Sequence, residues 1–392
     1  MVDEHDEGRN FVAVVFLMFA NTVMTINQGN IPAVYLQISQ EFGQGVVGLG
    51  FLTSNFFLAY ALFELPGGFI AAKFGPKKLV LVGTAISAFA VICSGLSPVF
   101  YALAIFRFVA GLGSGLAYPS TLVLIVRYFK RGSSGLGIGF MSISSSIGGL
   151  VGLFGWAVLS DVVGWRFSVL SGGLLGVAAL LALVFLLPKD TVQPNHRFQV
   201  THLKRIIFNR FLTAMAFANF GLGATVSVVT SFMVFYMEYN FGASPVLAGG
   251  VVGLGLAIPL LTNPLFGRAY DRMKNHKALF LVASATASAS VAVAAIKTLP
   301  AVIFTALATR PAQSGATILA LSTARELGAV NSEYESATVA WVDTFFLLGN
   351  FAAPIYFPFL AVSYGYPIAW LLGGSVAILF SLPTALMTRE KA

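Results

Sequence analysis

The sequence predicts an all-α membrane protein whose twelve transmembrane helices form two pseudo-symmetric six-helix bundles. Three observations support this prediction: long apolar stretches alternate with short polar gaps, basic residues concentrate in every second gap, and several features recur about 200 residues apart. Apolar residues make up 57% of the 392 residues, charged residues make up 10%, and the mean hydropathy is +0.85. Because about a quarter of the residues of a soluble domain are charged, this composition excludes an ordinary soluble protein.

Each predicted span has about 20 residues or more, which is the length that a helix needs to cross a hydrocarbon core of about 30 Å. The predicted spans are 11–35, 46–70, 78–96, 99–128, 134–158, 166–187, 209–236, 244–267, 278–296, 299–324, 335–360 and 366–387. A long polar and basic stretch separates the sixth span from the seventh. We therefore predict an N-terminal bundle over 1–187, a cytoplasmic linker over 188–208 and a C-terminal bundle over 209–392.

The distribution of Lys and Arg predicts the orientation of the chain. Of the 23 basic residues, 19 fall in gaps that share one side of the membrane if the chain crosses it twelve times. Arg166 and Lys297 fall in gaps on the other side, and Arg107 and Arg310 lie inside apolar spans. Because cytoplasmic loops carry the excess of Lys and Arg, both termini are predicted to be cytoplasmic, in a multi-pass protein of the cell membrane. The net charge of +8 then reflects topology and contact with lipid head groups, and no nucleic-acid partner is expected.

The two halves show signs of an internal repeat. The segment FANT at 19–22 recurs as FANF at 217–220, an offset of 198 residues. Gly68 and Gly267 open two related polar gaps 199 residues apart, and the two arginines inside spans are 203 apart. Both halves begin on the same side, so the repeat is predicted to be parallel, with its axis along the membrane normal.

The second cytoplasmic gap of each half carries the most specific motif, GFIAAKFGPKK in the first half and GRAYDRMKNHK in the second. Both segments resemble the G-x-L-A-D-R-x-G-R-K motif of the major facilitator superfamily of secondary transporters. The residues that match and that the family uses as a conformational latch are Gly68, Lys73, Gly75, Lys77, Gly267, Asp271 and Arg272. Ala72 stands where the family has Asp, and Lys274 stands where it has Gly. The resemblance implies two bundles that rock about a site near the membrane midplane.

The fourth span adds a second resemblance. The run RFVAGLGSGLAYPS, which begins at Arg107, is similar to the fourth-helix motif of the anion:cation symporter branch of this family. That branch often has an acidic residue between the glycines, where this chain has Ser114. In the fifth span Gly155 is followed by Trp156 and not by Pro, unlike the drug/proton antiporter signature. The resemblance therefore implies an anionic substrate.

Four charged residues inside the spans are candidates for function, because a charge at the centre of the bilayer costs at least about 2.5–3.5 kcal/mol. Arg310 lies about 16 Å into the tenth span and Asp343 about 12 Å into the eleventh. They either form a permanent structural pair, or Arg310 binds an anionic substrate while Asp343 gains and loses a coupling proton. Arg107 has either a structural role or a substrate role. Glu64, near the inner end of the second span, is a second proton-coupling candidate that also fits a gate or latch.

Uncharged polar residues extend the predicted substrate site. Asn21, Thr25 and Gln28 share one face of the first span at helical spacing, which is typical of a cavity wall. Asn219 occupies the matching place on the seventh span. These amides either bind substrate or join helices to one another. Tyr118 and Asn350 complete the set of substrate-binding candidates.

Secondary transport is the function that these residues favour, with proton-coupled symport of a small organic anion such as a sugar acid or monocarboxylate. The alternatives are a uniporter and an exporter of amphipathic compounds, the latter in view of the 36 Phe residues. An enzyme is not expected, since none of the four His residues recurs at metal-ligand spacing and no Ser/His/Asp or Cys/His set could meet inside the bundle. Neither a cofactor nor a metal is expected. A transporter-like sensor would need an output domain. The expected partners are an anionic small molecule, a proton and the lipid bilayer, and the expected state is a monomer.

Overall fold

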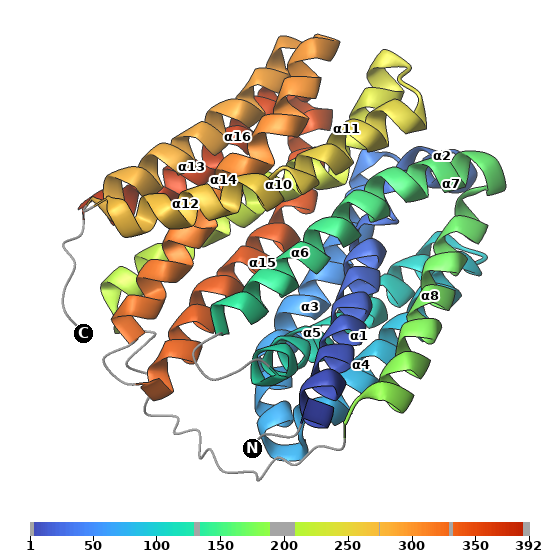
Figure 1. The fold of residues 1–392 in the computed structure, drawn as a ribbon. Helices are drawn as coiled ribbons and strands as arrows, with labels where there is room; N and C mark the ends of the chain where they lie inside the picture. The colour runs from blue at the N-terminus through green and yellow to red at the C-terminus, as the bar shows by residue number, and fades with distance from the viewer. Residues whose placement is uncertain (1–3, 129–133, 189–207, 274, 329–331, 387–392) are drawn as a thin grey trace. The chain divides into compact units, whose positions relative to one another are not determined.

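The computed structural model describes residues 4–128, 134–188, 208–273, 275–328 and 332–386 (Figure 1). These ranges are helical almost throughout, and they contain no β-strand. The helices up to residue 188 are α1 (Glu4–Gly29), a 3-10 turn (Pro32–Val34), α2 (Tyr35–Phe42), α3 (Val46–Phe74), α4 (Pro76–Gly95), α5 (Phe100–Tyr128), α6 (Ser134–Leu150), a π-helical turn (Val151–Gly155), α7 (Trp156–Val163) and α8 (Trp165–Leu186). The later ones are α10 (Arg210–Phe241), α11 (Pro245–Ala257), α12 (Pro259–Arg272), α13 (His276–Ala292), a 3-10 turn (Val293–Ile296), α14 (Leu299–Gly328), α15 (Ser332–Tyr364) and α16 (Tyr366–Leu386).

The predicted spans correspond closely to these helices. Eleven helical segments within the described residues are long and apolar enough to cross a membrane. The remaining predicted span, 299–324, corresponds to α14, which is 30 residues long but is interrupted in its middle by Arg310, Gln313 and Ser314. Those polar residues lower its mean hydropathy without shortening it. The twelve-span, all-α fold that the sequence predicts is therefore confirmed.

Contacts divide the chain into two compact units. One unit comprises Met1–Gly43 and Asn55–His196, and the other comprises Gln44–Ser54 and Arg197–Ala392. The first turns of α3 thus group with the later helices. Each unit has its own apolar core, built around Leu17 and Leu183 in the first and around Leu222 and Leu319 in the second.

The same contact joins the first and fifth spans within each unit. In the first unit Asn21 Nδ2 of α1 donates to Ser144 Oγ of α6 at 2.7 Å, and a Cβ on Gly148 of α6 would collide with the carbonyl of Thr22. In the second unit Asn219 Nδ2 of α10 donates to the carbonyl of Val342 in α15 at 3.0 Å. There a Cβ on Gly349 would collide with the carbonyl of Phe220. A hydrogen bond from an Asn side chain and a close contact at a glycine therefore recur at about the offset of the sequence repeat.

A second bridge recurs between the first and sixth spans of each unit. Asn27 Nδ2 of α1 donates to the carbonyl of Gly172 in α8 at 3.3 Å. Thr225, which lies 198 residues after Asn27, donates from Oγ1 to the carbonyl of Gly373 in α16 at 3.5 Å. Buried polar groups in lipid need partners inside the protein, so these bonds fix how the helices of each unit are rotated against one another.

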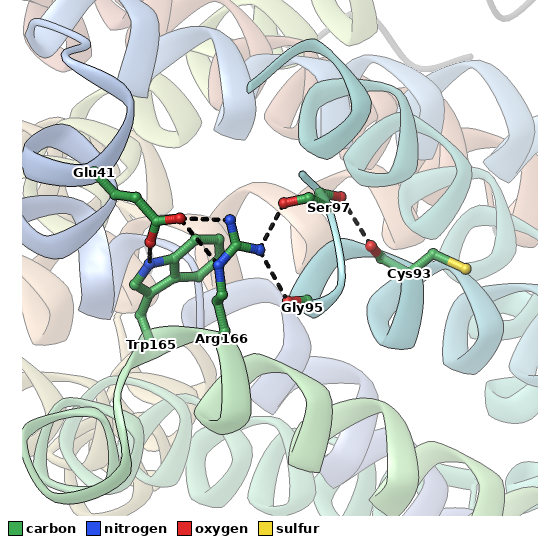
Figure 2. A network of polar contacts seen from close by, with 6 residues as sticks. All are labelled: Glu41, Cys93, Gly95, Ser97, Trp165 and Arg166. Atoms are coloured by element: carbon green, nitrogen blue, oxygen red, sulfur yellow. Dashed lines mark hydrogen bonds and ion pairs between the residues drawn. The ribbon is translucent and has the colours of Figure 1, made fainter. Parts of the chain in front are cut away.

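A polar cluster at the predicted outer end of the first unit explains why Arg166 departs from the charge pattern (Figure 2). Its Nε donates to Glu41 Oε1 at 3.0 Å, and its Nη1 donates to the carbonyl of Ser97 at 2.6 Å. Trp165 Nε1 donates to the other oxygen of Glu41 at 2.6 Å, and the guanidinium lies 4.6 Å from the Trp165 ring. Glu41 neutralises the charge of Arg166, and the cluster ties the ends of α2, α4 and α8 together.

Candidate functional site

Arg310 places a guanidinium in the middle of α14. It lies eleven residues after Leu299, the first residue of that helix, which places it about 16 Å along the axis. Its Nη1 donates to Gln313 Oε1 at 2.6 Å, and its Nε is buried without a hydrogen-bond partner. The side chain is partly exposed, and no carboxylate among the described residues lies at ion-pair distance from it. A guanidinium with free donors at this depth is suited to bind an anion.

Asp343 lies in α15 and is also partly exposed. It does not form an ion pair with Arg310 in the described part of the chain. Arg310 lies seven residues, about 10 Å, along α14 from Thr317, and Thr317 is linked through Asn219 to Val342 of α15. In the described structure a hydrogen-bonded route, and not a direct pair, therefore connects the surroundings of Arg310 and Asp343.

Asn219 and Asn21 bond to neighbouring helices. Asn219 is fully buried, donates to the carbonyl of Val342, and accepts from Thr317 Oγ1 at 3.4 Å. Asn21 is 1% exposed and donates to Ser144 and Ser145 of α6. The sequence leaves two roles open for these amides, and the structure shows one of them: both side chains form hydrogen bonds to a neighbouring helix.

The predicted stripe on α1 divides between two surroundings. Thr25 is partly buried and donates to the carbonyl of Asn21 in its own helix at 3.0 Å. Gln28 is partly exposed. Asn27 and Asn30, which lie beside this stripe, are buried and bonded to each other at 3.1 Å. Some polar residues at this end of α1 therefore form buried hydrogen bonds within the unit, while Gln28 stays partly exposed.

Arg107 is enclosed. Its side chain is 1% exposed, its Nη1 donates to the carbonyl of Asn27 in α1 at 2.9 Å, and its guanidinium lies 4.4 Å from the centre of the Phe56 ring of α3. Its Nε and Nη2 are buried without hydrogen-bond partners. This arrangement joins α5 to α1 and α3 and fits the structural role that the sequence leaves open for Arg107.

The remaining candidates differ in accessibility. Tyr118 is partly buried, and its ring packs edge-on against Tyr60 at 6.0 Å. Asn350 is 5% exposed and donates to the carbonyl of Phe346 within α15 at 2.8 Å. Glu64 is partly buried in α3, where the close approach of Gly115 to its backbone brings α5 against α3.

The predicted latch residues lie at helix ends. Gly75 has φ of 94°, a conformation that L residues rarely adopt, and it ends one helix so that Pro76 begins the next. Lys77 Nζ donates to the carbonyls of Leu187 and Pro188 at 2.6 and 3.1 Å, where a cation is favoured by the dipole of α8.

Among the other latch residues whose side chains the structure describes, none shows a hydrogen bond of this kind. Lys73 lies 5.3 Å from the ring of its neighbour Phe74, and Arg272 is exposed. Gly68 and Gly267 have open space where a Cβ would project. The side chain of Asp271 lies outside the described part of the structure.

Two residues that sequence reasoning missed are Gln313 and Thr317. Gln313 is 1% exposed and links Arg310 to Thr317, to whose Oγ1 its Nε2 donates at 2.7 Å. The signal was present in the sequence, because positions 310, 313 and 317 share one face of a helix. Ser144, the partner of Asn21, carried no comparable signal among the many Ser and Gly residues of its span.

A groove with a volume of about 690 Å³ lies between α10 and α16. Its lining residues are Phe208, Arg210, Thr213, Ala214, Phe217, Leu379, Phe380 and Pro383. None of the candidate substrate residues lines it, so we do not assign it to the substrate. Within the described residues, no group of three His, Cys, Asp or Glu side chains is placed to hold a metal ion.

Two helical bundles with matched internal bridges and intramembrane charges define a secondary transporter fold. The family model of the Major Facilitator Superfamily matches residues 15–337, so the chain belongs to this family. The fold is similar to that of a bacterial homologue of the human lysosomal transporter Spinster, in an inward-facing and unoccupied conformation, with a TM-score of 0.78, 14% identity and 96% of each chain covered. The chain is accordingly a multi-pass protein of the cell membrane.

Curated relatives match over about half of this chain. An uncharacterised transporter of this family from Mycobacterium tuberculosis, Rv1250, is 33% identical over 48% of this chain and 31% of its own length. The probable sulfoacetate transporter SauU of Cupriavidus necator is 29% identical over 50% of this chain and 45% of its own. The probable L-galactonate transporter of Escherichia coli is 27% identical over 42% and 36%. The matches thus span a third to a half of the relatives' lengths.

Proposed function

We propose that this chain carries a small organic anion across the membrane by alternating access, together with a proton. The observation that carries the proposal is the Arg310 guanidinium, which is partly exposed at mid-helix and has no carboxylate at ion-pair distance in the described residues. Leaving such a charge unpaired in the membrane is costly, and an anionic substrate would relieve that cost. Sulfoacetate and galactonate, which appear in the names of two relatives, are both anions of this kind.

Asp343 is the residue that we propose for proton coupling. It is partly exposed in α15 and is not held in an ion pair with Arg310, so its proton can exchange while the anion occupies Arg310. Glu64, the second candidate, lies in α3. We further propose that residues 1–187 and 209–392 rock as two bundles, with both termini in the cytoplasm, the latch residues at their cytoplasmic ends and one chain as the working unit.

The test is uptake into proteoliposomes of labelled sulfoacetate, galactonate and gallate, with and without an inward proton gradient. Gallate is included because another relative is a gallate transporter of Pseudomonas putida. We expect one of these anions to enter faster with the gradient. In Asp343→Asn the stimulation should disappear, while exchange of labelled for unlabelled anion continues. Uptake that ignores the gradient in both proteins would indicate a uniporter and contradict the proposed coupling.

An exporter of amphipathic compounds is the second candidate. It is favoured by a relative that is 29% identical over 44% of this chain, the tetracenomycin C resistance and export protein of Streptomyces glaucescens. Failure of all three anions to enter, together with gradient-driven extrusion of an amphipathic dye from the same vesicles, would favour this reading over the anion proposal.

A further inference from the structure

Polar side chains form a continuous hydrogen-bonded chain from Arg310 to the backbone of α15. Arg310 Nη1 donates to Gln313 Oε1 at 2.6 Å, and Gln313 Nε2 donates to Thr317 Oγ1 at 2.7 Å. Thr317 Oγ1 donates to Asn219 Oδ1 of α10 at 3.4 Å, and Asn219 Nδ2 donates to the carbonyl of Val342 at 3.0 Å. Val342 immediately precedes Asp343, so the chain joins the neighbourhoods of both candidate residues.

The direction of this chain is fixed at both ends. A guanidinium has only donors and a backbone carbonyl has only acceptors, so each intermediate group must accept on one side and donate on the other. Gln313 therefore presents its oxygen to Arg310, and Asn219 presents its nitrogen to Val342. Only one orientation of the two amides satisfies every bond.

Burial makes the chain difficult to break. Gln313 is 1% exposed and Asn219 is fully buried, so water cannot replace a lost partner there. A buried amide that loses its partner retains the full cost of desolvation, and bonds in series strengthen one another. Movement of the Arg310 guanidinium thus has a direct consequence for Gln313 and, through Thr317 and Asn219, for α15.

We propose that Gln313 is a positioning residue that orients Arg310 toward the anion and couples it to α15 beside Asp343. This inference rests on the proposed function. The chain takes the place of a direct ion pair: an anion that binds Arg310 while Gln313 holds its Nη1 shifts the guanidinium against Gln313 and changes the hydrogen bonding of the chain up to Val342. Binding of an anion at Arg310 thereby changes the hydrogen bonding next to Asp343, over a distance of about 10 Å along α14.

The test measures uptake of whichever of the three anions the wild type transports, in three variants of the chain and one control variant. In Gln313→Leu the guanidinium loses its partner, and we expect KM to rise at least 10-fold. In Gln313→Glu the new carboxylate competes with the substrate for Arg310, and KM should rise by a similar factor. Thr317→Val should reduce the stimulation by a proton gradient at least threefold.

The matched control is Thr305→Val. Thr305 also lies in α14, is fully buried and donates to the carbonyl of Ser290 at 2.8 Å, but it faces α13 and not the chain. It should leave KM and proton stimulation unchanged. Equal changes in Thr305→Val and Thr317→Val, or a wild-type KM in Gln313→Glu, would overturn the proposal by reducing the chain to packing.

A second measurement separates failure of this inference from failure of the proposed function. If the wild type transports none of the anions, the proposed function fails, and the chain is judged from melting temperatures of Gln313→Leu, Thr317→Val and the double variant. A cooperative chain predicts that the double variant melts close to the less stable single variant. Additive shifts would overturn the chain itself.

Discussion

Arg107 and Arg310 occupy matching places in the two halves of the sequence, but their surroundings are opposite. Arg107 is 1% exposed, bonded to a backbone carbonyl and stacked on Phe56. Arg310 is partly exposed and bonded only to Gln313 of its own helix among the described residues. One arginine is enclosed by its unit, whereas the other is partly exposed.

In this chain the contacts that join helices recur between the two units more closely than the surroundings of the two arginines do. The amide and glycine contacts between the first and fifth spans recur in both units. The arginine site does not recur, because α14 has a glutamine and a threonine below its arginine, where α5 has Ala110 and Ser114 at the equivalent spacing. Function can thus be asymmetric on a symmetric framework.

The largest predicted effect concerns the two arginines. Arg310→Met should lower anion uptake at least 100-fold, equivalent to about 2.8 kcal/mol, because it removes the charge that we propose for the substrate. Arg107→Met should keep uptake per folded molecule within about threefold of wild type. Initial rates in proteoliposomes, normalised to folded protein, measure both. An equal loss of uptake in the two variants would show that the two arginines do not differ in function.

Arg310→Lys sharpens this prediction. Lysine keeps the positive charge but lacks the planar fork that binds a carboxylate through two hydrogen bonds. Uptake by Arg310→Lys should therefore lie between that of Arg310→Met and that of the wild type. Full recovery of uptake would show that the positive charge alone suffices and that the hydrogen bond from Arg310 to Gln313 is unnecessary.

The second prediction compares the matched amides. Asn21→Ala and Asn219→Ala each remove a bond between the first and fifth spans, so each should destabilise its unit by about 0.6–1.7 kcal/mol. Only Asn219→Ala should also raise KM, because only Asn219 belongs to the chain that begins at Arg310. Melting temperatures and uptake kinetics of both variants provide the check. A raised KM in Asn21→Ala would assign a substrate role to the first half.

The smallest effect is expected at the Glu41 and Arg166 cluster. Glu41→Gln removes an ion pair whose side chains are 41% and 35% exposed, so the loss should not exceed about 1 kcal/mol. The melting temperature should fall slightly at low salt, less at high salt, and KM should not change. Lys297→Gln, at the other basic position on the predicted outer side, is the control. A change in KM for Glu41→Gln would mean that this cluster takes part in transport.

The sequence was sufficient to predict the spans because each depends on length and apolar composition alone. Even α14 was found, although Arg310, Gln313 and Ser314 interrupt its apolar run. The break of the fifth span at the π-helical turn Val151–Gly155 was not anticipated. Its glycine-rich sequence is compatible with several helical geometries.

The partners of the polar residues were harder to predict. A helix that is apolar on every side has no preferred face, so its rotation within the bundle cannot be read from periodicity. For this reason the sequence left open whether Asn21 and Asn219 bind substrate or neighbouring helices. It also allowed Arg310 and Asp343 to pair, because depth along two separate helices says nothing of how those helices are shifted against each other.

The most direct test is anion binding to the purified protein in detergent. Binding is measured as the rise in melting temperature with increasing concentration of sulfoacetate, galactonate or gallate. Wild type, Arg310→Met and Arg107→Met should be measured side by side at one pH and salt concentration. The account predicts that at least one anion stabilises wild type and Arg107→Met alike and does not stabilise Arg310→Met. Stabilisation of Arg310→Met to the same extent as wild type would contradict it.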